Sequence, residues 1–121
     1  MSKPHLLIED YAGVTVVTVT DTALLDAHAI EAFGQEVYQL VDKQNKQKLI
    51  LDFSNVRFLS SQALGVLLTI KKKCEAIKGR FVLCALREEL MKVFKITQFD
   101  KLFDFYPGDS AALASCIVKV D

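Results

Sequence analysis

The sequence predicts an α/β fold, in which a mixed, mostly parallel β-sheet begins with a β-hairpin and is covered by about four α-helices. Two short β-rich runs open the chain, and later apolar runs alternate with segments of helical periodicity. The length of 121 residues fits one domain, and 51% hydrophobic against 25% charged residues is typical of a globular protein. We therefore expect residues 1–121 to form a single domain with a core from about residue 5 to residue 118.

The first third of the chain predicts the hairpin and one helix. Residues 5–10 and 14–20 favour strands, and residues 11–13 between them include a glycine suited to a turn. Asp26 is a suitable N-cap. Apolar residues then recur at spacings of three and four, which predicts an amphipathic helix over residues 27–43.

The middle of the chain predicts two strands that are buried on both faces. Residues 49–53 and 81–86 are nearly continuous apolar runs, the pattern of central parallel strands. Between them, residues 54–55 supply a turn, and residues 56–59 lead into a second amphipathic helix that ends at Gly79.

The last third predicts two further helices, over residues 87–95 and roughly 110–119, with a short strand at residues 103–106 between them. After the opening hairpin, helices and strands thus alternate to the end of the chain. This order is what a sheet with central parallel strands requires.

The charge pattern limits the classes of partner. The 15 basic and 15 acidic side chains give a net charge of zero, which argues against a nucleic-acid partner. The charges are nevertheless segregated, because residues 1–42 hold seven acidic side chains and one basic, whereas residues 43–101 hold thirteen basic and five acidic. This segregation permits oriented docking on a partner, and solvated helix faces would also produce it.

The sequence favours a cytoplasmic protein. It contains no stretch of about 18 uncharged apolar residues and no apolar run near the start, so we expect neither direct membrane insertion nor a signal peptide. Cys74, Cys84 and Cys116 are far apart and lie among apolar residues. We expect three buried, reduced thiols, with neither a disulfide framework nor a metal site.

Residues suited to catalysis are scarce. Phosphate-loop, dinucleotide-binding, GxSxG and HExxH motifs are missing from the sequence. The two histidines are His5 and His28, and we expect His28 to be exposed in the first turn of a helix. We predict that the protein is not an enzyme and uses no cofactor, although binding of a small ligand such as a nucleotide stays open.

The most informative segment is residues 52–65, where a buried strand ends and two serines open a helix. Ser60 is a suitable N-cap, and its hydroxyl would then accept a backbone N–H. Ser61 would be the first helical residue, with its side chain free at a helix start that favours negative charge. A phosphoryl group there would add a charge of roughly −1.5 to −2 without unfolding the helix.

Residues 52–67 resemble the signature segment of STAS domains, specifically of bacterial anti-sigma-factor antagonists. Supporting matches are residues 25–26, 79–84, 93–96 and 102–103, so the resemblance spans nearly the whole chain. It implies a protein that, when unphosphorylated, binds an anti-sigma factor that is also a serine kinase, and so releases the sigma factor. The kinase would phosphorylate the serine that matches Ser61, and a phosphatase would reset the cycle.

The resemblance also implies a partner-binding edge. It places Asp26 near the start of the second helix, and we expect the partner to contact five residues, Asp26, Ser60, Ser61, Gln62 and Gly65. Gly65 would allow close approach on the exposed side of the helix. The oligomeric state is not predicted.

The chain departs from the family pattern within this segment. The family usually has aspartate, two serines and glycine where this chain has Ser60-Ser61-Gln62-Ala63. The missing carboxylate leaves Ser60 as a rival phosphorylation site. The alternative is a STAS module in another assembly, such as a stress-sensing complex or an accessory subunit of a lipid transporter.

Overall fold

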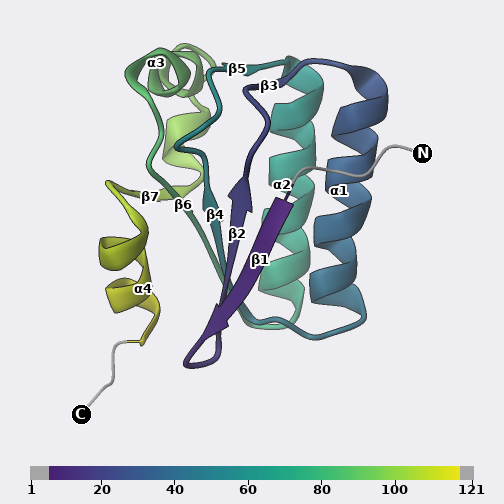
Figure 1. The fold of residues 1–121 in the computed structure, drawn as a ribbon, viewed down its shortest axis with the longest axis vertical. Coiled ribbons are helices and arrows are strands. Elements are labelled where there is room, and N and C mark those ends of the chain that lie inside the picture. Colours follow the sequence, from purple (N-terminus) through teal and green to yellow (C-terminus); the bar gives the residue numbers. More distant parts are fainter. Residues whose placement is uncertain (1–5, 118–121) are drawn as a thin grey trace.

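The computed structural model describes residues 6–117 and contains the predicted mixed sheet (Figure 1). Its strands lie in the order β1-β2-β4-β6-β7, and all neighbours are parallel except β1 and β2, which form the opening antiparallel hairpin. The strands are β1 (Leu6–Tyr11), β2 (Val14–Val19), β4 (Lys48–Asp52), β6 (Arg80–Cys84) and β7 (Asp104–Tyr106).

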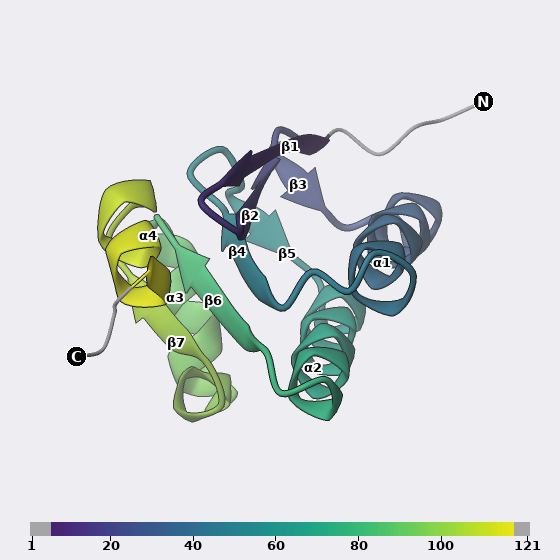
Figure 2. The ribbon, with the colours of Figure 1, turned by 90° about the horizontal axis from the view of Figure 1, so that it is seen from below.

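Within the described residues, four α-helices cover the sheet, which confirms the predicted layers. Three of them pack on one face and α4 packs on the other (Figure 2). They are α1 (Ala27–Asp42), α2 (Ser61–Ala76), α3 (Glu88–Ile96) and α4 (Asp109–Ile117), with a 3₁₀ turn, η1 (Phe99–Lys101), after α3. The predicted last helix reaches residue 119, and its final two residues lie outside the described part. Within residues 6–117, no helix has the length and apolar character needed to cross a membrane.

The central strands are buried on both faces, as their continuous apolar runs predict. Leu49 and Leu51 of β4 point into the larger core beneath α1, α2 and α3, whereas Ile50 between them points toward α4. The smaller core is closed by Ala112 and Cys116 of α4. All three cysteines are buried, as expected.

A second, two-stranded sheet was not predicted. Its strands are β3 (Ala23–Leu24) and β5 (Phe58–Leu59), which pair in parallel. The sequence interpretation had residues 56–59 only as a lead into the helix, because two-residue strands show no periodicity. Backbone bonds extend this pairing, with Ser60 N donating to Leu24 O at 3.1 Å and Arg57 N donating to Thr22 O at 2.6 Å. The start of α2 is thereby fixed beside the segment that enters α1.

The end of α2 differs in detail from the prediction that Gly79 ends it. The left-handed residue after the helix is Lys78, with φ 59°, and Gly79 follows it. Lys78 N donates to Glu75 O and Gly79 N to Cys74 O, which is the Schellman arrangement. Gly79 is needed for a different reason: a Cβ atom there would overlap the carbonyl oxygen of Gln47 and lie 3.0 Å from its carbonyl carbon. The two chain segments can approach this closely only with glycine.

A cluster of polar side chains beneath the turn after β4 connects the sheet to α4. One ligand-type atom from each of Asp52, Cys84 and Asp109 lies within 4.8 Å of the others. Asp52 also accepts a 2.8 Å hydrogen bond from Ser54 N, and so holds the turn that leads toward β5. The Cys84 thiol donates to Asp109 Oδ1 at 3.2 Å.

The pKa values of the two carboxyl groups of this cluster are shifted in opposite directions, so that in mild acid they hold one proton between them. The hydrogen bond with Asp52 and partial burial raise the pKa of Asp109 to about 6. Burial alone would raise the pKa of Asp52, but hydrogen bonds from Asp109 and Ser54 lower it below its usual value. Asp109 therefore donates to an ionised Asp52 in mild acid, and both groups are charged at neutral pH.

We expect Gly79→Ala to lower the free energy of unfolding by roughly 2 kcal/mol, because the added methyl group meets backbone that cannot move aside. Gly65→Ala is the matched control, since Gly65 lies within α2 with open space around its Cβ position. Chemical denaturation should show the control to be as stable as the parent protein or more stable. Equal stability of the two alanine variants would contradict the proposed close approach.

The shared proton predicts a pH dependence. A carboxyl whose pKa is raised on folding contributes stability below its unfolded value near 4, and that contribution is lost as the pH rises through about 6. Asp109→Asn should therefore gain about 1 kcal/mol relative to the parent between pH 4.5 and 7, a value discounted for the exposure of Asp109.

The measurement is denaturation of the parent and the variant across this pH range. Glu89→Gln, which removes an exposed carboxylate from the first turn of α3, is the control and should show no such gain. A parallel pH dependence of the parent and Asp109→Asn would rule out the shared proton.

Candidate functional site

The start of α2 has the geometry expected for a cap followed by a free serine. Ser60 has extended backbone, with φ −92° and ψ 168°, and its Oγ accepts a hydrogen bond from Ala63 N at 3.3 Å. Ser60 is half-buried, whereas Ser61, the first residue of the helix, is exposed. The roles of Ser60 as N-cap and Ser61 as first helical residue are thus confirmed.

Asp26 occupies the equivalent position on the neighbouring helix. Its Oδ2 accepts a hydrogen bond from Ala29 N at 2.9 Å, and the side chain remains exposed. Both helices begin at the same end of the molecule, where β3 and β5 lie side by side (Figure 1). Because Ser60 N donates to Leu24 O, both caps lie at the end of one short ladder of backbone hydrogen bonds.

The surface continues along α2 into a shallow groove between α1 and α2. Gln62 and Val66 of α2 line this groove of about 260 Å³ together with residues of α1, namely Glu31, Gly34, Gln35 and Tyr38. One turn after Ser61, Gly65 is exposed, and no atom lies within 4 Å of the position of its absent Cβ. The structure therefore brings the α2 residues Ser60, Ser61, Gln62 and Gly65 together on one edge, beside Asp26.

Two apolar residues on this edge were missed by the sequence interpretation. Leu25 is 55% exposed and Phe58 is 53% exposed. Leu25 directly follows β3 and Phe58 is the first residue of β5, so both flank the small sheet that precedes the two helices. Leu25 directly precedes the cap Asp26, and Phe58 lies two residues before the cap Ser60. These positions become informative only once β3 and β5 are known to pair.

The electrostatics of this edge favour an anion at the start of α2. The first turn of α2 contains no acidic side chain, and its N–H groups have no partners within the helix apart from the cap at Ala63. A phosphoryl group on Ser61 would lie close to these donors. Ser60 itself brings no carboxylate, so the acidic side chains described on this edge, Asp26 and Glu31, belong to α1 and its cap.

The edge has few groups that could activate a hydroxyl. His28 is exposed near the start of α1, as expected, and His5 lies outside the described residues. Among residues 6–117, Asp52, Cys84 and Asp109 form the one cluster with metal-ligand types in reach of one another. Burial and the bond to Asp109 raise the pKa of the Cys84 thiol far above its ordinary value, which opposes ligation by thiolate.

Comparison with known proteins agrees with the geometry. The pattern of the STAS domain family matches residues 5–112 of this chain. A protein of Bordetella bronchiseptica, BtrV, provisionally named as an anti-sigma factor antagonist, is 31% identical over 85 residues, which is 70% of this chain and 72% of that protein.

Solved structures extend the likeness across the whole fold. An anti-sigma factor antagonist from Mycobacterium paratuberculosis has a TM-score of 0.80 and 30% identity, with 92% of each chain covered. The phosphorylated form of the Bacillus protein SpoIIAA, at 20% identity, has a TM-score of 0.70, with 91% of this chain and 97% of that chain covered. The five-stranded mixed sheet and its four helices within residues 6–117, together with the match over residues 5–112, show that this chain belongs to the STAS domain family, whose members similar to it include anti-sigma factor antagonists.

Proposed function

We propose that the protein is an anti-sigma factor antagonist, a binding domain that sequesters an anti-sigma serine kinase and is switched off by phosphorylation of Ser61. The observation that carries this proposal is the exposed Ser61 at the first position of α2, beside a half-buried Ser60 whose hydroxyl caps the helix. Support also comes from the relatives named as antagonists, and from SpoIIAA, whose fold is shared and which has been solved in a phosphorylated form.

Phosphorylation would act on partner binding rather than on the fold. The new phosphate would stand at a helix start, where the N–H groups and the helix dipole favour negative charge. In the complex, the same phosphate would place a dianion beside Leu25 and Phe58. These two exposed apolar side chains are suited to a contact that excludes water. The free protein tolerates the phosphate, and the complex does not.

Ser61 is the better acceptor of the two serines. A kinase must reach the hydroxyl oxygen and align it with the γ-phosphate of ATP, which requires exposure. Ser61 is exposed, whereas Ser60 is half-buried and its oxygen accepts the Ala63 N–H. Modification of Ser60 would require the cap to rearrange.

The mechanism implies two partners. They are a serine kinase that is also an anti-sigma factor, and a phosphatase that removes the phosphate. The binding domain itself needs no cofactor and carries out no catalysis, because the hydroxyl is supplied by this chain and the chemistry by the kinase. The cytoplasm is where a sigma factor and its regulators would meet.

A STAS module in another assembly is the alternative, and the residue at position 60 is the observation that favours it. The serine there removes the carboxylate that family members usually place beside the acceptor. Affinity purification from the native host distinguishes the two functions. A kinase-like anti-sigma factor in the eluate supports the antagonist, and transporter or scaffold subunits support the alternative.

We expect Ser61→Asp to weaken binding to the anti-sigma kinase by about tenfold or more, because it places a negative charge within the contact edge. Isothermal titration calorimetry with the kinase of the same genome measures the change. Ser61→Ala tests loss of the hydroxyl alone and should bind within about twofold of the parent. Gln39→Glu adds the same charge to an exposed position on the distal part of α1 and should leave affinity unchanged. Unchanged affinity of Ser61→Asp would rule out the electrostatic switch.

Gly65→Ala should separate binding from stability. Alanine favours helix over glycine by up to about 1 kcal/mol, and the added methyl group meets nothing within the chain. The variant should therefore unfold at a higher denaturant concentration and yet bind the kinase less tightly, because the partner approaches this face closely. Undiminished binding by the stabilised variant would show that Gly65 lies outside the interface.

A further inference from the structure

The cations of the middle segment gather around a groove far from Ser61. The groove has a volume of about 420 Å³ and lies between the second half of α2 and the η1–β7 corner, with the first residues of β6 beneath it. Lys71, Arg80 and Lys101 line it from three different elements. One more lysine adjoins these walls, since Lys78 precedes Gly79 of the lining. We call these four cations and this groove the basic groove.

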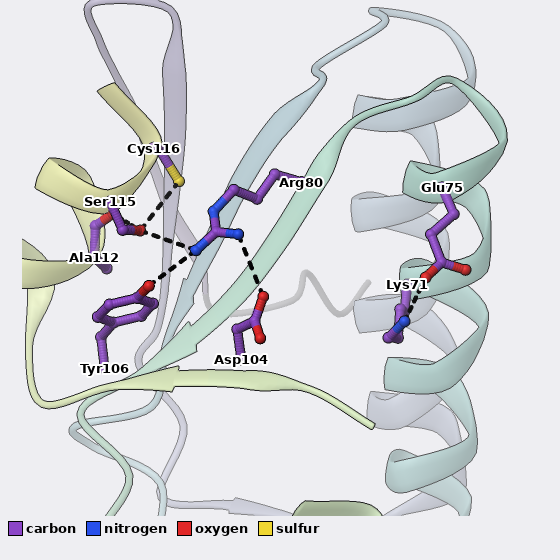
Figure 3. Close-up of polar contacts among 8 residues, drawn as sticks. All are labelled: Lys71, Glu75, Arg80, Asp104, Tyr106, Ala112, Ser115 and Cys116. Carbon is purple, nitrogen blue, oxygen red and sulfur yellow. Dashed lines mark hydrogen bonds and ion pairs between the residues drawn. The ribbon is translucent and has the colours of Figure 1, made fainter. Parts of the chain in front are cut away.

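Two of the four cations are already neutralised by carboxylates of the groove (Figure 3). Lys71 forms an ion pair with Glu75 one turn along α2. Arg80 bonds to Asp104 at 3.3 Å, to the Tyr106 hydroxyl at 3.0 Å and to Ser115 at 3.3 Å, and so holds β7 and α4 against β6.

The other two cations are exposed and unpaired. Within the part of the chain that the structure describes, Lys78 and Lys101 form no ion pair or hydrogen bond through their side chains. The groove therefore has a surplus of positive charge at its rim. The interior of the fold does not use this charge, and Ser61 lies ten residues before Lys71 on the same helix, at a distance of about 15 Å along its axis.

The floor of the basic groove is apolar. Cys74 of α2, Phe81 of β6 and Phe103 before β7 form this floor, and they are nearly buried, with Phe81 and Phe103 each 7% exposed. Leu102 stands at the rim and is 42% exposed. A ligand that carries one apolar group between negative charges would fit this groove. Its apolar group would contact the recessed floor, and its charges would lie at the cationic rim.

The same details argue against a membrane or a nucleic acid as the occupant. A bilayer surface is flat and could not reach a recessed floor, whereas a single side chain could. The carboxylates of Glu75 and Asp104 on the walls would repel a continuous polyanion, and a flexible peptide can place its own charges between them.

We propose that the basic groove binds an acidic peptide segment of a partner protein, which inserts one aromatic or aliphatic side chain between α2 and the η1–β7 corner. This contact is separate from the edge that carries Ser61, so the protein would hold two partners, or two parts of one partner, at the same time. It also gives a function to the excess of basic side chains in residues 43–101, which the antagonist function does not require.

A direct test uses a fluorescein-labelled peptide in which glutamates alternate with glycines on both sides of a single central phenylalanine, titrated with the full chain and followed by fluorescence anisotropy. We expect saturable binding that weakens with added salt. Lys78→Glu combined with Lys101→Glu should weaken binding by about tenfold or more. The matched control, Lys92→Glu combined with Lys95→Glu, makes the same change of charge at exposed positions of α3 and should have little effect.

Further measurements distinguish this proposal from other occupants of the groove. A peptide with alanine in place of phenylalanine should bind more weakly, and Ser61→Asp should leave peptide binding unchanged even if it abolishes kinase binding. The proposal is overturned by a lack of saturable binding, or by equal weakening of peptide binding in the two double charge-reversal variants. It is also overturned if the unlabelled chain sediments with phosphatidylserine vesicles instead of binding the peptide, or if reversal of Lys78 and Lys101 only abolishes self-association.

Discussion

The short parallel pairing of β3 with β5 is the constraint on which the functional edge depends. Without the bond from Ser60 N to Leu24 O, α1 and α2 would be joined only through their packing, and their first turns could shift independently. The ladder fixes Ser60 beside the segment that carries Asp26, so two helix caps lie on one edge. Leu25 and Phe58, at the ends of this ladder, are exposed to solvent.

The local charge at this edge explains the proposed regulation better than the net charge of the protein. The total is zero, and it conceals a basic groove at the second half of α2 and an acid-free first turn at the start of the same helix. One phosphate on Ser61 would change the total by about −2, but its effect on a partner comes from its position next to exposed apolar side chains. The serine at position 60 makes this environment more neutral than the aspartate usual in the family would.

Periodicity and local chemistry were sufficient to predict the larger elements and the helix caps. The apolar runs at residues 49–53 and 81–86 have the pattern of central strands, and Ser60 before an amphipathic run could be identified as a cap. The features that escaped prediction depend on contacts between distant residues. Asp52 and Asp109 share a proton across 57 positions of sequence, the need for Gly79 arises from the carbonyl of Gln47, and the basic groove combines residues of α2, β6 and η1. β3 and β5 were missed because strands of two residues carry no pattern.

The most direct test of the phosphorylation switch is phosphate mapping by mass spectrometry, after incubation of the full chain with ATP and the anti-sigma serine kinase of the same genome. We expect a single phosphate on Ser61, which should disappear in Ser61→Ala and persist in Ser60→Ala once that variant is shown to fold. Phosphate on Ser60, or a chain that stays unmodified while the kinase modifies a known substrate, would contradict the switch.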